Sequence, residues 1–148
     1  MDTRILDAAF QTFLERGLAG ASVEEIAGRA RAGKPTIYAR FSSKEALFTA
    51  VVMRHMASNA ARFDSHVPTG VTIEQRLAGV GAAVLHWGLA SETVELMRLA
   101  IAEARRLPEL ASSVGEMARE HAAEGVARLL REAVLADEQA AVVRSRSP

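Results

Sequence analysis

The sequence predicts an all-α protein, and three observations lead to that prediction. Only 5% of the residues are aromatic, and the strong helix formers Ala, Leu, Glu and Arg are abundant. Apolar residues recur at helical spacing in one segment after another. Capping signals, glycines and prolines separate these segments. A polar stretch at 64–70 divides the chain. We therefore expect an N-terminal domain over 1–48, a linking helix that continues to about 63, and a C-terminal helical domain over 64–148.

Composition excludes several classes of function. The chain has 148 residues and no cysteine, so disulfides, thiolate nucleophiles and cysteine-based metal sites are excluded. The N-terminus lacks the charged and then apolar pattern of a signal segment. The longest apolar run, Gly79 to Ala90, contains His86 and is far shorter than the roughly 20 residues that a membrane helix needs. We expect a soluble, cytoplasmic protein that does not enter a membrane.

Charge is unevenly distributed along the chain, although the formal net charge is +0. Residues 1–63 contain 9 Lys and Arg against 6 Asp and Glu, so this part carries +3 and the remainder −3. A mildly basic end on an acidic body is typical of a protein that contacts phosphates with one end only.

The first predicted helix spans Thr3 to Arg16. One stripe of this helix is apolar and is expected to face the core. The stripe consists of Ile5, Leu6, Ala9, Phe10, Phe13 and Leu14. Gly17 follows it and is placed to end the helix in a left-handed conformation.

Two short helices joined by a tight turn are predicted over 22–41. Ser22 is followed three residues later by Glu25, which is the capping-box signature of a helix start. One face of this first short helix is apolar at buried spacing; it contains Val23, Ile26, Ala27 and Ala30. Gly33 marks the turn. Pro35 lies in the first turn of the second helix, where its missing N–H costs nothing.

The second short helix has an unusual outer surface. Only Ile37 and Phe41 share an apolar face, at i, i+4 spacing. The opposite side carries two cations, a hydroxyl and a phenol: Lys34, Thr36, Tyr38 and Arg40. A helix with one narrow anchoring stripe and a basic, hydrogen-bonding outer face suits the major groove of DNA. The alternative is an ordinary solvated helix in an all-α protein.

These residues belong to a longer pattern over about the first fifty positions. It consists of Ile5-Leu6-Asp7-Ala8-Ala9-Phe10, Phe13, Gly17, Ser22-Val23, Ile26-Ala27, Ala30, Lys34, Pro35-Thr36-Ile37-Tyr38, Phe41 and Ser43-Lys44-Glu45-Ala46-Leu47. The pattern resembles the N-terminal domain of the TetR (tetracycline repressor) family of bacterial transcription regulators. Two positions depart from it: Arg31 stands where a turn glycine is common, and Gly33 where Ser or Thr usually caps the recognition helix. Since Gly caps only a few tenths of a kcal/mol less well than Ser, the helix should still form.

A second S-x-x-E sequence, Ser42 to Glu45, predicts the start of the linking helix, which continues to about Phe63. Lys44 lies in its first turn, where a cation opposes the helix dipole. An exposed cation there costs only tenths of a kcal/mol, so the position can be neutral. Given the resemblance, we expect a DNA phosphate to bind here.

The resemblance implies a sequence-specific DNA-binding regulator. We expect a repressor that responds to a small molecule and acts as a homodimer on palindromic double-stranded operator DNA. The residues assigned to the major groove are Lys34, Pro35, Thr36 and Tyr38, and those assigned to phosphates are Ser22, Arg40 and Lys44.

The C-terminal domain is predicted to contain three helices, over about 72–89, 91–106 and 111–133. Pro108 is expected to break the chain before the last one. The stretch Leu96 to Ala111 resembles the C-terminal domain of one TetR subgroup. Five residues are candidates for the lining of an effector cavity: His86, Trp87, Met97, Met117 and His121. Each of them, taken singly, is more often plain core.

Other chemistry is not indicated. His121 and Glu124 form the only ligand-like pair, and no third ligand follows at suitable spacing, so we predict no metal site. Neither a nucleophile elbow nor a glycine-rich phosphate loop is present. We therefore expect neither an enzyme nor a cofactor.

The helical pattern weakens after Ala136, and 144–148 is expected to be a frayed tail. TetR-family members usually continue through two further helices that pair with their copies in a dimer. The resemblance thus implies a shortened C-terminal domain, which either dimerises through a reduced surface or has impaired pairing. The alternative is a shortened helical homologue, a protein-partner module that pairs with a full-length regulator and inhibits it without binding an operator itself.

Overall fold

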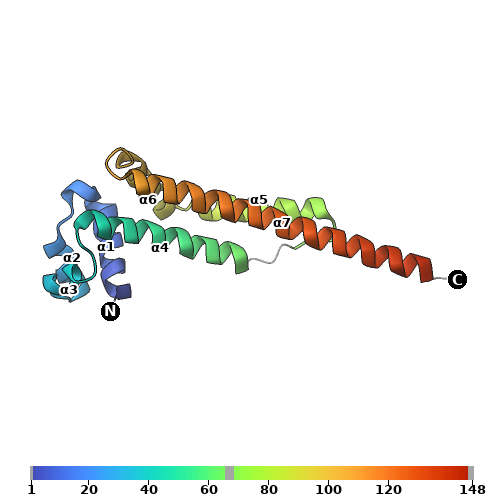
Figure 1. Ribbon diagram of the computed structural model, residues 1–148, viewed down its shortest axis with the longest axis horizontal. Helices are drawn as coiled ribbons and strands as arrows, with labels where there is room; N and C mark the ends of the chain where they lie inside the picture. The colour runs from blue at the N-terminus through green and yellow to red at the C-terminus, as the bar shows by residue number, and fades with distance from the viewer. Residues whose placement is uncertain (1, 66–68, 147–148) are drawn as a thin grey trace.

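The computed structural model describes residues 2–65 and 69–146, except the side chains of residues 122, 129, 133 and 136–146. This part of the chain is helical and contains no strand, which confirms the all-α prediction. The helices are α1 (Asp2–Gly20), α2 (Val23–Ala30), α3 (Lys34–Tyr38), α4 (Lys44–Ser65), α5 (Ile73–Gly88), α6 (Ser91–Ala102) and α7 (Pro108–Arg146). The molecule is elongated, with α1–α3 at one end and the C-terminal end of α7 at the other (Figure 1).

The head of the molecule, defined here as α1–α3 with the N-terminal half of α4, has a closed apolar core. Helix α1 packs on both α2 and α4, and the ring of Phe13 meets that of Phe48 edge to face at 5.1 Å. The fully buried side chains of the head are Ile5, Thr12, Phe13, Ile26, Ile37, Leu47, Phe48 and Val52. Burial of each large apolar side chain contributes about 1.5–3 kcal/mol. This core holds α3 at a fixed angle to α1.

Local signals redirect α1 and begin α2 as the sequence predicts, although α1 continues past the predicted end at Arg16 to Gly20. Gly17 has a φ of 68°, so the helix changes direction there. The Ser22 hydroxyl accepts the backbone N–H of Glu25 at 3.1 Å. The Glu25 carboxylate accepts from Arg29 at 2.9 Å instead of turning back to Ser22. Ser22 therefore caps α2, but the reciprocal half of the capping box is replaced by an ion pair.

Arg31 adopts the left-handed conformation that a glycine usually supplies, with φ 50° and ψ 47°. For a residue with a side chain this costs on the order of 1 kcal/mol. Two backbone bonds offset the cost: the N–H of Arg31 donates to the carbonyl of Gly28 at 3.2 Å, and that of Ala32 to Ala27 at 3.0 Å. The departure from the family pattern at this position is thus accommodated without a change of fold.

The start of α4 differs from the prediction by one residue. The hydroxyl of Ser43, not that of Ser42, accepts the backbone N–H of Ala46 at 3.0 Å. Helix α4 therefore begins at Lys44, and the S-x-x-E pattern ending at Glu45 is out of register with the cap. In this register Leu47 is fully buried in the head. The cap at Ser43 and the buried position of Leu47 thus agree on the start of the helix.

The body consists of α5–α7 and the C-terminal half of α4. Helix α4 runs away from the head, α5 returns beside α7, α6 lies near the head, and α7 runs outward again (Figure 1). Thr72 and Gln75 form a complete capping box at the start of α5. Leu96, Ala100 and Leu110 join the apolar cluster of the head, so head and body share one continuous core. Pro68 of the predicted boundary lies outside the described residues.

Helix α7 is longer than predicted. It begins at Pro108 and continues to Arg146, instead of spanning 111–133. A proline is tolerated at the first helical position because its missing N–H would have no partner there. After Gly125 the sequence contains no glycine or proline before Pro148, so nothing stops the helix. Residues 147–148 of the predicted tail lie outside the described residues.

Candidate nucleic-acid interface and ligand cavity

Helix α3 is anchored on one side and exposed on the other. Ile37 is 1% exposed and holds the helix to the head, whereas Tyr38, about 100° further round the helix, is 51% exposed. Thr36 is half-buried, and Lys34 and Pro35 are exposed. The helix is short, and the N–H groups of Thr36 and Ile37 donate to the carbonyl of Gly33 at its start. The side chains assigned to the major groove thus lie on an accessible face.

Lys34 is paired within the head. Its ammonium donates to the Glu24 carboxylate at 2.6 Å, across the turn between α2 and α3. The hydrogen bond from Lys34 holds the pKa of Glu24 below its ordinary value, and the same bond raises the pKa of Lys34. Both side chains are exposed, so water screens the pair and a phosphate can compete with Glu24 for the cation.

The two remaining cations of the predicted interface also have partners. Arg40 forms an ion pair with Asp2 at the start of α1. Lys44 donates to the carbonyls of Ala21 at 3.0 Å and Ala19 at 3.4 Å. Those carbonyls lie at the C-terminal end of α1, Ala19 in its last turn and Ala21 just after it, where a cation is favourable. This offsets the unfavourable dipole of α4. Lys44 therefore has a structural partner that the sequence did not predict.

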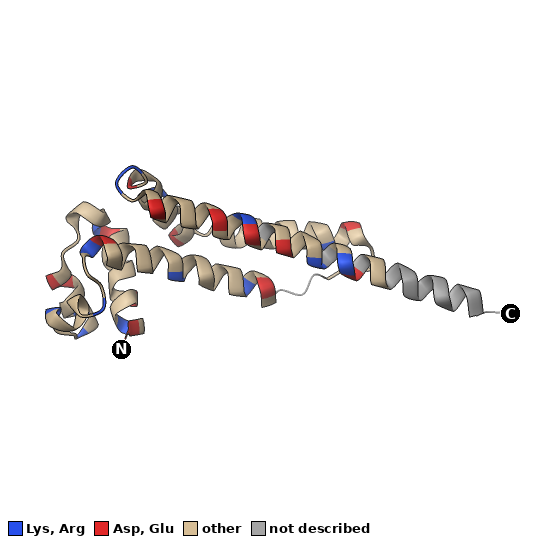
Figure 2. Cartoon of the chain, in the orientation of Figure 1, with Lys and Arg blue, Asp and Glu red and all other residues tan. Residues whose placement is uncertain are grey.

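Charges of both signs are interspersed over the head (Figure 2). Further pairs join α1 to its neighbours: Arg29 with Glu15 at 2.5 Å and Arg54 with Asp7 at 2.8 Å. All of these pairs are solvent-exposed, so they contribute little to stability and can exchange partners. The interface is better described as a set of screened pairs than as a uniformly basic surface.

A cavity of about 340 Å³ lies in the body between α4, α5, α6 and α7. Four of the five residues that the sequence suggests for an effector cavity line it: Trp87, Met97, Met117 and His121. His86 does not line it and is exposed. Helical rotation explains the difference, because neighbours on one helix point about 100° apart and only Trp87 of the two faces inward.

The wall that α4 contributes to this cavity was not predicted from the sequence. It consists of Met56, Asn59, Ala60 and Phe63. These residues recur at i, i+3, i+4 and i+7, which is one face of a helix. Phe63 and Trp87 meet edge to face with ring centroids 6.4 Å apart. The spacing was visible in the sequence, but it does not distinguish a cavity wall from a packed face.

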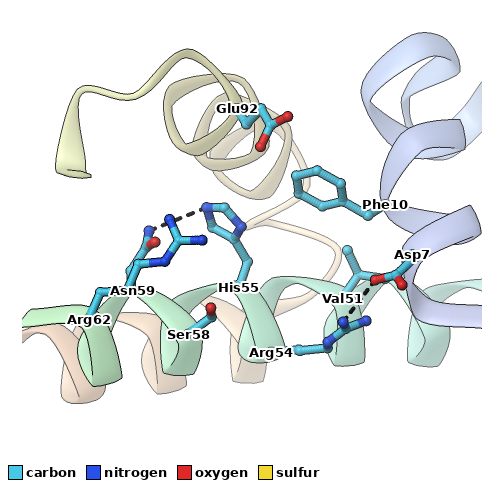
Figure 3. A pocket seen from close by; sticks show the side chains of 9 residues that line it. All are labelled: Asp7, Phe10, Val51, Arg54, His55, Ser58, Asn59, Arg62 and Glu92. Atoms are coloured by element: carbon cyan, nitrogen blue, oxygen red, sulfur yellow. Dashed lines mark hydrogen bonds and ion pairs between the residues drawn. The ribbon is translucent and has the colours of Figure 1, made fainter. Parts of the chain in front are cut away.

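A smaller cavity of about 180 Å³ lies between head and body and contains His55 (Figure 3). The imidazole of His55 stacks on Phe10 of α1, with ring centroids 5.3 Å apart and an interplanar angle of 17°. Its Nε2 lies 2.9 Å from the Thr93 hydroxyl and 3.3 Å from the Asn59 amide nitrogen. Burial lowers the pKa of His55, with Arg62 adding to the effect and Glu92 opposing it.

One tautomer of His55 satisfies all three contacts of this group. Asn59 Nδ2 donates to Thr93 Oγ1 at 3.2 Å. A neutral imidazole with an unprotonated Nε2 can accept from both the Thr93 hydroxyl and the Asn59 amide. These three side chains, from α4 and α6, are called the His55 cluster below. Sequence reasoning missed it because Thr93 is 38 positions away from His55.

A short exposed helix held by a helix-turn-helix on a helical body is the arrangement of a DNA-binding regulator. Residues 5–51 match the bacterial regulatory proteins of the tetR family. Residues 75–139 match the C-terminal domain of AefR-like transcriptional repressors. Together the two matches cover more than half of the chain. The chain belongs to the TetR family of bacterial regulators. The descriptions of the family and of its members name regulators of transcription, not enzymes.

Individual relatives support the same family. The transcriptional activator FasR of Mycolicibacterium smegmatis is 38% identical over 74 residues, which are 50% of this chain and 34% of FasR. A TetR-family protein from Mesorhizobium loti has a TM-score of 0.83 at 29% identity, over 92% of this chain and 69% of its own. The flavonoid-responsive regulator FrrA has a TM-score of 0.69 at 32% identity, over 90% of this chain and 68% of the FrrA chain. This chain thus spans about a third of the length of FasR.

Two features are absent from the described residues. Three or more His, Cys, Asp or Glu side chains do not come together there in a geometry that would hold a metal ion. Within the same residues, each helix is too short or too polar to span a bilayer.

Proposed function

We propose that this chain binds operator DNA with α3 in the major groove and regulates transcription as a repressor. One observation carries the proposal: Ile37 is the buried residue of α3, and the helix exposes Tyr38 on its outer face. Lys34, Pro35, Thr36 and Tyr38 contact base edges, and Ser22, Arg40 and Lys44 contact phosphates. The phosphate contacts fix the register of the protein on the duplex, and the base-edge contacts select the DNA sequence.

The phosphate contacts form by exchange of ion-pair partners. Lys34 and Arg40 leave Glu24 and Asp2 when a phosphate oxygen replaces the carboxylate. Each exchange releases a counterion from the DNA, which makes affinity fall as salt rises. Lys44 uses two backbone carbonyls as partners, and an ammonium has three donors. One N–H of Lys44 thus stays available for a phosphate.

A second copy of the chain is the proposed partner in DNA binding. Val126, Leu130 and Val134 recur every four residues on α7 and are 50–58% exposed. Leu85 on α5 is 60% exposed, and Leu89, just after the end of α5, is 67% exposed. Burial of such faces between two copies would stabilise a homodimer. Its two heads would read half-sites of a palindrome about 34–36 Å apart.

The cavity in the body is the proposed effector site. It has the concave, mainly apolar character of small-molecule sites, and α4 lines both the cavity and the head. FrrA is a flavonoid-responsive relative, which supports a small-molecule response in this chain as well. A ligand that favours one position of α4 would change the distance between heads and release DNA by population shift. Such a regulator acts in the cytoplasm.

Duplex selection with the full chain tests the DNA-binding proposal. Enrichment from random duplexes should give a palindrome, and light scattering should show two copies on it. Tyr38→Ala should weaken binding to that site by about 1–3 kcal/mol and random DNA far less. Tyr38→Phe, which keeps the ring, is the matched control for the hydroxyl. Equal loss on both DNAs would remove Tyr38 from sequence readout, and failure to enrich any duplex would refute the proposed function.

A further inference from the structure

We propose that the body cavity takes an uncharged, mainly apolar ligand that carries a hydrogen-bond donor, and that this donor binds Asn59 of the His55 cluster. The ligand would then act on the side chain that ties the body to the head. The inference rests on the proposed function, because it identifies the chemical class of the effector and its point of action.

The charge of the ligand follows from the cavity lining. Among the described residues that line the cavity there is no Asp, Glu, Lys or Arg. The polar side chains are Asn59, Thr93 and His121, and the other residues are apolar, with Met56, Phe63 and Trp87 among them. The cavity is partly open to solvent, but a charge set against this lining would lose hydration without gaining a counter-charge, so the proposed ligand is uncharged. A volume of about 340 Å³ suits a molecule at the small end of the range for ligand sites.

The hydrogen-bonding character of the ligand follows from the groups that are still available. His121 donates from Nδ1 to the carbonyl of Met117 at 2.8 Å. In the neutral imidazole Nε2 is then an acceptor. Asn59 uses Nδ2 for Thr93 and His55. In the part of the chain that the structure describes, Oδ1 of Asn59 has no hydrogen-bond partner. Both available groups accept, so the ligand must donate, as an alcohol, a phenol or an N–H does.

Asn59 connects this cavity to the head. It lines both the large cavity of the body and the small cavity beside the head. Its amide is planar, so a ligand that reorients Oδ1 also moves Nδ2 away from His55 and Thr93. In Figure 3 His55 lies between Asn59 and Phe10, on the side of α4 that faces α1. One side chain therefore separates the ligand from the ring that stacks on the head.

Two dyes with the same skeleton test the predicted ligand class. N-phenyl-1-naphthylamine is uncharged, apolar and has one N–H, and 8-anilino-1-naphthalenesulfonate is the same molecule with a sulfonate. Trp87, the single tryptophan of the chain, lines the cavity and can transfer excitation energy to either dye. We expect binding of the uncharged dye with quenching of Trp87, and roughly tenfold or more weaker binding of the sulfonate because its charge would be buried unpaired. Equal affinity for both dyes would overturn the proposal.

A pair of variants locates the dye. Ala60 lines the cavity, and Ala57, one turn earlier on α4, is exposed outside it. Ala60→Phe should fill the cavity and abolish quenching of Trp87 by the uncharged dye, whereas Ala57→Phe should leave it unchanged. If quenching of Trp87 persisted in both variants, the dye would lie on the apolar surface and the proposed site would be refuted. The comparison of the two dyes on the unaltered chain remains decisive if Ala60→Phe does not fold.

Magnetic resonance tests the point of action. Asn59 is the only asparagine of the chain, so its side-chain amide signals are assigned by their loss in Asn59→Ala. The uncharged dye should shift these signals together with the ring signals of His55, and should leave His55 unshifted in Asn59→Ala. A bound dye that shifts neither residue would overturn the proposed contact. DNA is absent from every one of these measurements, so failure of the proposed DNA binding would be seen separately in duplex selection.

Discussion

The head and the body bury their apolar residues to very different degrees. In the head, Phe13 and Phe48 are completely buried, and their rings are in contact. In the body, Leu89 and Ile101 are 67% and 73% exposed, and a cavity separates the helices. A closed core fixes geometry, which a reader of DNA requires. A body with open apolar faces and a cavity has surfaces that other molecules can cover.

The largest expected effect is a core truncation in the head. Phe13→Ala should lower the free energy of unfolding by about 3–5 kcal/mol, because it leaves a cavity in a closed core. Met97→Ala in the body should cost clearly less, since Met97 is half-buried and already lines a cavity. Urea unfolding followed by circular dichroism measures both. Equal losses would show that the two regions do not differ in packing as described.

The next largest expected effect is the loss of DNA affinity when Lys44 is replaced. Lys44→Ala should lower affinity for all DNA sequences alike and reduce the slope of log K against log salt by about one. Arg131→Ala, which removes an exposed cation from the body, is the control and should leave the slope unchanged. Salt titrations by fluorescence anisotropy measure the slope. If Lys44→Ala weakens only the fold, then its bonds to Ala19 and Ala21 are its whole role.

A smaller effect of opposite sign is expected for Glu24. Glu24→Gln frees Lys34 from its carboxylate partner and should raise affinity for random DNA, since the phosphate no longer competes with an acid. Glu15→Gln makes the same change of charge on the head but leaves the pair between Lys34 and Glu24 intact. It should raise affinity less. If the two variants gained the same affinity for random DNA, the cause would be net charge and not the pair between Lys34 and Glu24.

The smallest effect is the pH dependence that His55 gives to the junction of head and body. Burial holds the folded-state pKa of His55 below its ordinary value of 6.5, so between these two values the unfolded chain binds more protons. Its contribution to stability is therefore complete above pH 6.5 and is lost as pH falls toward the folded-state pKa. His55→Gln should flatten this part of the profile of stability against pH. A profile unchanged by His55→Gln would contradict the sign argued here.

The DNA-binding part of the molecule was the more predictable one. Its signals are local: Ser22 caps α2, Gly17 turns α1, and the spacing of Ile26 and Ile37 places each helix face. Such signals act within one or two helical turns, so periodicity and caps suffice to find them. The length of α7 was missed because a weak pattern without glycine or proline permits a helix but does not require one.

The sequence by itself determined the helices, their buried faces and the exposure of Tyr38, since these depend on residues a few positions apart. Only the tertiary structure decided that Lys44 binds the carbonyls at the end of α1, that Trp87 but not His86 faces the cavity, and that His55 stacks on Phe10. Each of these contacts depends on the angle and distance between helices. The summed packing of the whole core sets those quantities, and no single segment contains them.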